Sequence, residues 1–170
     1  NHRQLTSYCS CYSWICKWYR RFFRQSEERL KEAVQRYFYL NTRYEKKAPS
    51  FEGKNKKTKT KTEYTCHREE RDSFIKKFGQ KEFEKISKED LTWAKLQDIE
   101  IPQEYTWVFE QFLNIFWSCE RDFNGNVIFR PKDILDYEDF IGIQFTYKER
   151  GLLLQMKYWA SEIIYQVKES

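Results

Sequence analysis

The feature that most constrains this fold is a stripe of large apolar side chains in the last third of the chain. The stripe repeats at steps of three and four residues, the spacing of one helix face, through Tyr105, Val108, Phe109, Phe112, Ile115, Phe116 and Cys119. Pro102 precedes it, and proline suits a first helical turn because its missing N–H is not needed there. We therefore predict a helix with one buried face and with Cys119 as a small core residue.

Turn and capping signals follow this helix. Asn124-Gly125 favours a tight turn with positive φ, and residues 127–129 are expected to form a short extended piece at most. Pro131 then suits the start of a second helix. Gly142 can close that helix in the left-handed conformation.

A third helix is predicted to follow, because Thr146 and Glu149 have the spacing of a capping box. Its expected inner face consists of Leu152, Leu153, Met156, Trp159, Ile163 and Val167. The sequence thus predicts a three-helix C-terminal domain at residues 101–170, with a short turn or minimal hairpin between its helices.

The first part of the chain is predicted to be a basic aromatic N-terminal helical arm at residues 1–47. Ser26, followed by two glutamates, is typical of a helix start. Leu30, Val34 and Phe38 then recur at steps of four, which places them on one face. That helix is expected to end near residue 40 or 41.

Two more segments connect this arm to the C-terminal domain. Residues 48–65 are predicted to be a Lys-rich flexible linker, because like charges repel and little apolar surface rewards ordering. Residues 66–100 are predicted to be a charged helical segment, broken at Gly79 and with a capping box from Ser87 to Asp90. The expected fold class is mostly α, a small helical bundle with a basic N-terminal arm.

Charge and cysteine content bound the class of protein. Residues 1–66 hold sixteen Lys or Arg against six Asp or Glu, and residues 67–170 hold fifteen against twenty. This asymmetry predicts a basic arm on a mildly acidic body.

The five cysteines are odd in number, no signal peptide is evident and no apolar stretch is long enough to cross a bilayer. Reduced thiols in a cytoplasm are the expected state.

No catalytic motif accompanies the fold. The chain lacks a Gly-rich phosphate loop, a nucleophile elbow and a His-Glu-x-x-His helix, so we predict a protein that is not an enzyme and has no cofactor. A zinc site could be assembled only from dispersed residues, Cys9, Cys11, Cys16, Cys66 and His67, without paired two-residue spacings. Unpaired thiols are preferred to a metal site.

A second metal alternative is an Mg²⁺ site among four acidic residues near Pro131. They are Asp133, Asp136, Glu138 and Asp139. Carboxylates early in a helix usually complement its dipole and face solvent, and no second carboxylate group is placed opposite. We therefore expect surface carboxylates and no metal.

Residues of the arm allow two functional interpretations. The candidate contacts are Trp14, Trp18, Tyr19, Arg20 and Arg21. Cations that neutralise phosphates and aromatic rings that stack on bases can bind single-stranded nucleic acid. Trp, Tyr and Arg are also the usual anchors of protein interfaces. A protein partner is preferred, and a small nucleic-acid-binding accessory protein is the alternative.

The segment from about residue 101 to residue 164 resembles a domain of tail assembly proteins from long-tailed bacteriophages. The resemblance lies in Pro102 and its aromatic helix, in Asn124-Gly125, and in the Thr146-to-Glu149 cap followed by an apolar and an aromatic residue. In two places the chain departs from that pattern. Lys157 stands where an acidic residue is common, and Arg130-Pro131 replaces a small capping residue.

This resemblance implies a tail assembly chaperone that makes transient contacts with the tail tube protein and the tape-measure protein. It implies no enzymatic activity and a location in the host cytoplasm. Tyr105 and Trp107 join the arm residues as candidate contacts. In such phages the longer chaperone form arises by ribosomal frameshifting. The chain begins at Asn1 and has Met156 as its only methionine, which suits a frameshift product, a processing site or a trimmed boundary.

Overall fold

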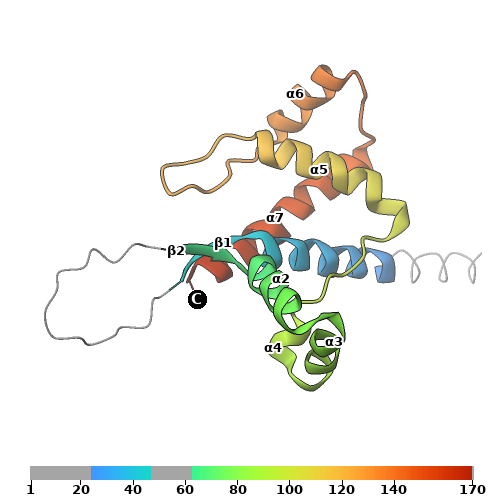
Figure 1. Ribbon diagram of the computed structural model, residues 1–170. Coiled ribbons are helices and arrows are strands. Elements are labelled where there is room, and N and C mark those ends of the chain that lie inside the picture. Colours follow the sequence, from blue (N-terminus) through green and yellow to red (C-terminus); the bar gives the residue numbers. More distant parts are fainter. Residues whose placement is uncertain (1–23, 47–62, 170) are drawn as a thin grey trace, which may run out of the picture.

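The protein is mostly helical, as predicted, and the computed structural model describes residues 24–46 and 63–169 (Figure 1). A helix that we call the first helix covers residues 24–41. The elements after it are β1 (Arg43–Lys46), β2 (Glu63–Cys66), α2 (His67–Phe78), α3 (Gln80–Glu89), α4 (Leu91–Ala94), the 3-10 helix η1 (Gln103–Tyr105), α5 (Thr106–Ser118), α6 (Pro131–Ile141) and α7 (Tyr147–Glu169).

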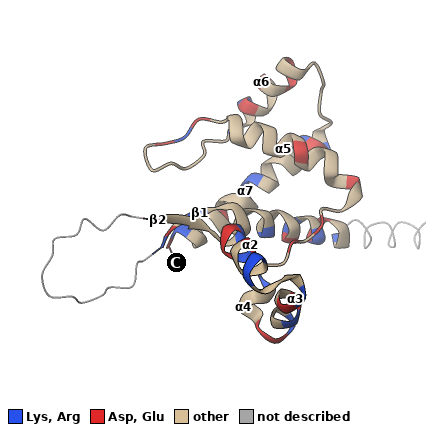
Figure 2. Cartoon of the chain, viewed as in Figure 1, with Lys and Arg blue, Asp and Glu red and all other residues tan. Residues whose placement is uncertain are grey.

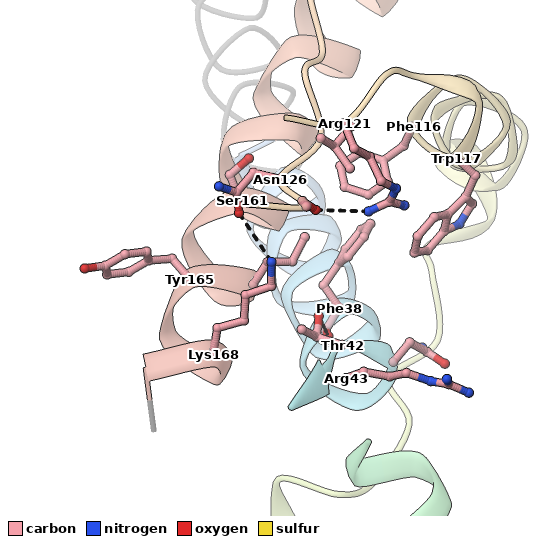
Figure 3. A pocket seen from close by; sticks show the side chains of 14 residues that line it. Phe38, Thr42, Arg43, Phe116, Trp117, Arg121, Asn126, Ser161, Tyr165 and Lys168 are labelled. Carbon is pink, nitrogen blue, oxygen red and sulfur yellow. Dashed lines mark hydrogen bonds between the residues drawn. The ribbon is translucent and has the colours of Figure 1, made fainter. Parts of the chain in front are cut away.

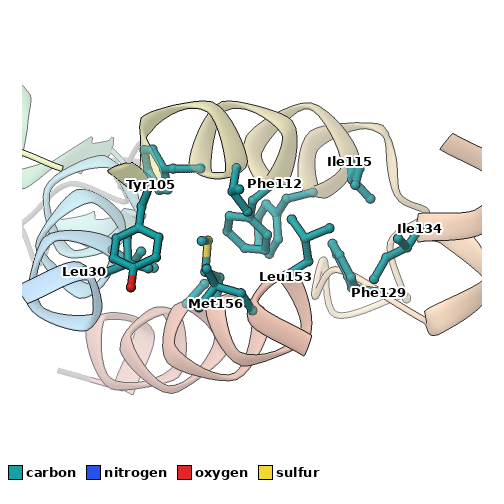
Figure 4. Packing of buried hydrophobic residues seen from close by; sticks show 14 of the residues in the cluster. Leu30, Tyr105, Phe112, Ile115, Phe129, Ile134, Leu153 and Met156 are labelled. Carbon is teal, nitrogen blue, oxygen red and sulfur yellow. The ribbon is translucent and has the colours of Figure 1, made fainter. Parts of the chain in front are cut away.

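The main core lies between the first helix, α5 and α7 (Figure 4). Its largest fully buried side chains are Leu30, Val34, Phe38, Phe112, Ile115, Phe116, Ile134, Leu153 and Met156. The aromatic stripe of α5 is therefore buried as its spacing predicted. The first helix, which belongs to the segment expected to be an arm, shares this core with the C-terminal helices.

Phe38, on the first helix, packs against α5. Its ring centroid lies 4.9 Å from that of Phe116 and 6.1 Å from that of Phe112, both edge-on. Such aromatic pairs contribute about 0.5–1.5 kcal/mol beyond the area they bury. The predicted helix start at Ser26 is wrong, because residues 24 and 25 are already helical. The Ser26 hydroxyl is buried and donates a hydrogen bond to the Glu104 carboxylate.

The connection from α5 to α6 is a minimal hairpin. Arg121 and Val127 form an antiparallel bridge, and Gly125 adopts the positive φ of 75° that the turn requires. The Asp122 carboxylate accepts hydrogen bonds of 2.8 Å from the backbone N–H groups of both Asn124 and Asn126. The turn predicted from Asn124-Gly125 is thus confirmed.

The caps of α6 and α7 also match their predictions. Pro131 is the first residue of α6, and Gly142 ends that helix with φ 71°. The Glu149 carboxylate accepts a 2.7 Å hydrogen bond from the Thr146 N–H, and the Glu149 N–H donates to the Thr146 hydroxyl at 3.2 Å. These reciprocal bonds are the predicted capping box.

A smaller hydrophobic cluster joins the first helix to α2, α3 and α4. Its buried residues are Leu40, Phe83 and Leu96, with Tyr39, Phe74, Ile75 and Trp93 packed against them. Gly79 separates α2 from α3 as predicted, with φ 92°. Figure 2 shows acidic and basic residues along α2, in keeping with a segment predicted to be charged and helical.

The capping box predicted from Ser87 to Asp90 is wrong. Ser87 lies inside α3, where it is buried and its hydroxyl accepts a 2.5 Å hydrogen bond from the Gln97 amide. Asp90 instead caps α4 by accepting from the Thr92 N–H at 2.7 Å. The reason is that α3 continues through residue 89, so the chain has not left the helix at Ser87.

The strands β1 and β2 pair antiparallel, with Arg43 opposite Cys66 and Lys46 opposite Glu63. Residues 63–65, expected to end the flexible linker, thus belong to a strand. The rest of that linker, residues 48–62, lies outside the described residues.

Candidate functional site

The candidate contact residues predicted from the sequence have different outcomes. Trp14, Trp18, Tyr19, Arg20 and Arg21 lie outside the described residues. Tyr105 belongs to the core, with 6% of its surface exposed, and burial raises the pKa of its phenol. It is therefore a packing residue and not an exposed contact, because it is the last residue of η1 and turns inward at the start of α5. Trp107 is 40% exposed.

Trp107 lies beside the connection between α6 and α7. Its ring centroid lies 5.5 Å from that of Phe145, in the connection between these helices. Around that connection Phe140 is 85% exposed, Tyr147 is 93% exposed and Ile143 is also exposed. We call Trp107, Phe140, Ile143 and Tyr147 the α6–α7 corner. Large apolar groups gathered on a surface mark interaction sites more often than isolated ones do.

An ion pair between the buried Glu138 and the partly exposed Arg150 connects the two helices of the α6–α7 corner. The Glu138 carboxylate accepts from Arg150 at 3.0 Å and 2.8 Å and from the Phe145 N–H at 2.5 Å. The hydrogen bonds from Arg150 hold the pKa of Glu138 below its usual value. The expectation that Glu138 is a surface carboxylate is wrong, because it lies four residues after Ile134 on the inner face of α6. Asp136 and Asp139 are exposed as expected.

A pocket of about 630 Å³ opens where the end of the first helix, β1, the α5–α6 connection and α7 meet (Figure 3). Its lining residues are Phe38, Asn41, Thr42, Arg43, Phe116, Trp117, Arg121, Gly125, Asn126, Val127, Ser161, Ile164, Tyr165 and Lys168. Phe38 and Phe116 form its floor and are almost fully buried. We call this the basic pocket, because three of its residues are cations.

The cations of the basic pocket have weak or neutral partners. The Arg121 guanidinium lies 5.5 Å from the centre of the Trp117 ring and donates to the Gly125 carbonyl at 3.3 Å. The Lys168 ammonium donates to the Asn126 side-chain carbonyl at 3.3 Å. Arg43 is 3.7 Å from a glutamate of α2. Among the described residues that line the pocket, none is Asp or Glu.

The basic pocket has features of a binding site and lacks those of a catalytic one. Its hydroxyl groups have no imidazole, thiol or carboxylate among the described lining residues to activate them, and nucleophilic or acid–base catalysis needs such a neighbour. What the arrangement offers is positive charge beside apolar side chains.

A second polar cluster surrounds His67. The imidazole stacks on Tyr39 with 4.3 Å between ring centroids, and its Nδ1 lies 3.2 Å from the Tyr44 hydroxyl and 3.7 Å from the Glu70 carboxylate. Burial lowers the pKa of His67, and Glu70 opposes that shift. Burial and then Glu70 raise the pKa of Tyr44, which keeps its hydroxyl protonated. The rings of Tyr39 and Tyr44 both contact the imidazole, which favours a packing role.

The described thiols and carboxylates form no metal centre. Cys66 and Cys119 are free. Cys119, predicted to be a core residue, is half-buried at the end of α5 and packs against the core, where burial raises its pKa to about 11. Within residues 24–46 and 63–169, no three His, Cys, Asp or Glu side chains are grouped to hold a metal ion. Cys9, Cys11 and Cys16 of the zinc alternative lie outside that range. Of the helices in the same range, none is long and apolar enough to span a bilayer.

Comparisons with protein-family models, curated proteins and solved structures found no significant match. The functional argument therefore rests on the surfaces described above. Sequence reasoning missed the Glu138–Arg150 pair and the basic pocket. The four-residue step from Ile134 to Glu138 is a signal that could have placed this carboxylate on an inner helix face.

Proposed function

We propose that this chain is a phage tail assembly chaperone-like protein that makes transient contacts with tail tube and tape-measure proteins. The observation that carries the proposal is the α6–α7 corner, where the rings of Phe140 and Tyr147 are almost fully exposed. The resemblance of residues 101–164 to tail assembly proteins supports the choice of partners. A cytoplasmic location follows from the same proposal.

The α6–α7 corner has the properties of a protein-docking surface. Exposed aromatic rings dominate the energy of protein interfaces because they bury much apolar area with little loss of side-chain freedom. Here the backbone that carries them is fixed by the Gly142 and Thr146 caps and by the Glu138 ion pair. A fixed presentation lowers the entropic cost of binding.

The decisive experiment measures binding of the full-length protein to purified tail tube protein and tape-measure protein by biolayer interferometry. A double substitution, Phe140→Ser with Tyr147→Ala, removes the two most exposed rings of the corner. We expect at least about a tenfold loss of affinity, because hot-spot residues contribute about 2 kcal/mol or more each. Both positions are exposed, so the unfolding transition should be almost unchanged.

Leu91→Ser is the matched control, because Leu91 is 83% exposed but belongs to α4. Its affinity should stay within about twofold of wild type, as expected of a residue outside an interface. Failure of both proteins to bind the wild-type chain would overturn the proposal. If the double variant binds as tightly as wild type, the α6–α7 corner is not the contact surface.

The alternative is a small nucleic-acid-binding accessory protein that uses the basic N-terminal arm. The observation that favours it is the excess of cations in residues 1–66, together with Arg121 and Lys168 in the basic pocket. An anisotropy titration with a labelled single strand at low and high salt tests it. If the chain contacts phosphates, its affinity for the strand should fall steeply as the salt concentration rises. Weak binding with an affinity that does not change with salt would exclude this function.

A further inference from the structure

We propose that the basic pocket binds an acidic peptide segment of a partner protein. An apolar side chain of the peptide would lie against Trp117, Val127 and Ile164, and a neighbouring carboxylate would lie between Arg121 and Lys168. The residues of this site are all different from those of the α6–α7 corner. The two proposals can therefore fail independently.

The positions of the two cations support an anionic ligand. Arg121 and Lys168 donate to Gly125 and Asn126, two consecutive residues of the α5–α6 connection. Figure 3 shows the two charged groups beside this turn, on neighbouring sides of the pocket. Both described acceptors are neutral carbonyl oxygens, so the positive charges keep an attraction for an anion.

Asp122, next to Arg121 in the chain, directs its hydrogen bonds to the turn. The Asp122 carboxylate accepts hydrogen bonds from the N–H groups of Asn124 and Asn126 and from the Asn126 side chain at 3.1 Å. The hydrogen bond from the Asn126 backbone is the main cause of its lowered pKa, and Lys168 contributes least. The Asp122 carboxylate thus stabilises the turn, and the described residues that line the pocket include three cations and no acid.

The apolar part of the site suits one or two side chains. Trp117 is about half exposed, at 51%, and Val127 and Ile164 are half-buried, so all three offer surface to a ligand. The volume of about 630 Å³ lies within the roughly 300–1,000 Å³ of usual ligand pockets. An aromatic or branched aliphatic side chain fits this space, whereas a whole helix or strand does not.

The aromatic rings of the pocket favour a peptide over a nucleic acid. A base needs an open ring face on which to stack. Arg121 already covers one face of Trp117, the Phe38 ring lies 6.3 Å away, and Phe116 is only 1% exposed. Tyr165 points away from the pocket in Figure 3. A carboxylate, by contrast, can pair with both cations without displacing a ring.

Fluorescence anisotropy with three labelled peptides tests the proposal. One has a Glu-Phe-Glu centre, one replaces both glutamates by glutamine, and one replaces phenylalanine by alanine; a labelled single-stranded oligonucleotide is the fourth probe. We expect the first peptide to bind at least about tenfold more tightly than either analogue, as charge-assisted hydrogen bonds and apolar burial both contribute. High salt should weaken it.

Variants of the full chain locate the binding. Arg121→Gln with Lys168→Gln should reduce affinity for the first peptide at least about tenfold. Lys157→Gln is the matched control, because Lys157 is a cation of α7 that does not line the pocket. Ser161→Trp, at an exposed lining position of α7, fills the space and should abolish binding while preserving the helix.

Three outcomes would overturn the proposal: equal binding of the glutamine analogue, tighter binding of the oligonucleotide, or wild-type affinity in Ser161→Trp. The Phe140→Ser and Tyr147→Ala double variant should keep full peptide affinity. This last measurement separates the basic pocket from the α6–α7 corner, whatever the fate of the proposed chaperone function.

Discussion

Arg150 donates two hydrogen bonds to Glu138, from Nε at 3.0 Å and from an NH group at 2.8 Å, and thereby joins α7 to α6. The carboxylate is buried at 5% exposure, while the arginine reaches the surface. A third hydrogen bond from the Phe145 N–H satisfies the same carboxylate. The pair fixes the angle at which the α6–α7 corner is presented.

Glu138→Gln should destabilise the protein by roughly 1–3 kcal/mol at neutral pH, because a buried charged hydrogen-bond network loses its charge. Arg150 holds the folded-state pKa of Glu138 below its usual 4.5. The stabilisation is therefore complete above about pH 4.5 and is lost as the pH falls through the folded-state pKa. Urea unfolding across acidic pH measures both effects.

Asp136→Asn is the control for this pair, since Asp136 is an exposed carboxylate of the same helix. It should change the free energy of unfolding by less than about 0.5 kcal/mol, as is usual for exposed positions. An identical pH dependence in wild type and Glu138→Gln would contradict the assigned role of the pair.

Phe38→Ala should destabilise the whole molecule by about 3–5 kcal/mol, the usual cost of removing a buried phenylalanine. Phe38 is 1% exposed and its ring contacts α5. Phe123→Ala, at a fully exposed ring of the α5–α6 connection, should have almost no effect. Chemical denaturation followed by circular dichroism compares them, and a small effect of Phe38→Ala would separate the first helix from the core.

The elements were more predictable than their packing. Periodic spacing located the buried faces of α5 and of the first helix, and Gly142 and Thr146 marked helix ends because capping depends on local chemistry. The docking of Phe38 on Phe116 joins residues far apart in the chain, which no local pattern encodes. The basic pocket was missed for the same reason, since Arg43, Arg121 and Lys168 meet only through the tertiary fold.

Two glycines should respond in opposite directions to alanine. Gly142 has φ 71°, where a Cβ is strained, so Gly142→Ala should cost about 1–2 kcal/mol. Gly151 lies inside α7 with no atom near the position of an added Cβ, so Gly151→Ala should stabilise by about 0.5–1 kcal/mol. Thermal unfolding of the two variants measures the signs. The same sign for both would contradict the assigned backbone conformations.

His67 should titrate below its ordinary pKa of 6.5, because burial lowers the pKa more than Glu70 raises it. Its contribution to stability is complete above about pH 6.5 and is lost as the pH falls through the lowered pKa. Wild type should therefore lose more unfolding free energy between neutral and mildly acidic pH than His67→Phe does. NMR titration of the imidazole checks the pKa, and a value at or above 6.5 would contradict the burial described.

Phe38 and Leu40, two residues apart on the first helix, belong to different hydrophobic clusters. The cluster around Leu40 contains few fully buried side chains, while the one around Phe38 unites three long helices. Amide hydrogens of α2, α3 and α4 should consequently exchange with solvent at a lower opening free energy than those of α5 and α7. We therefore expect the first helix to mark the border between a part of the molecule that opens more readily and a part that opens closer to global unfolding.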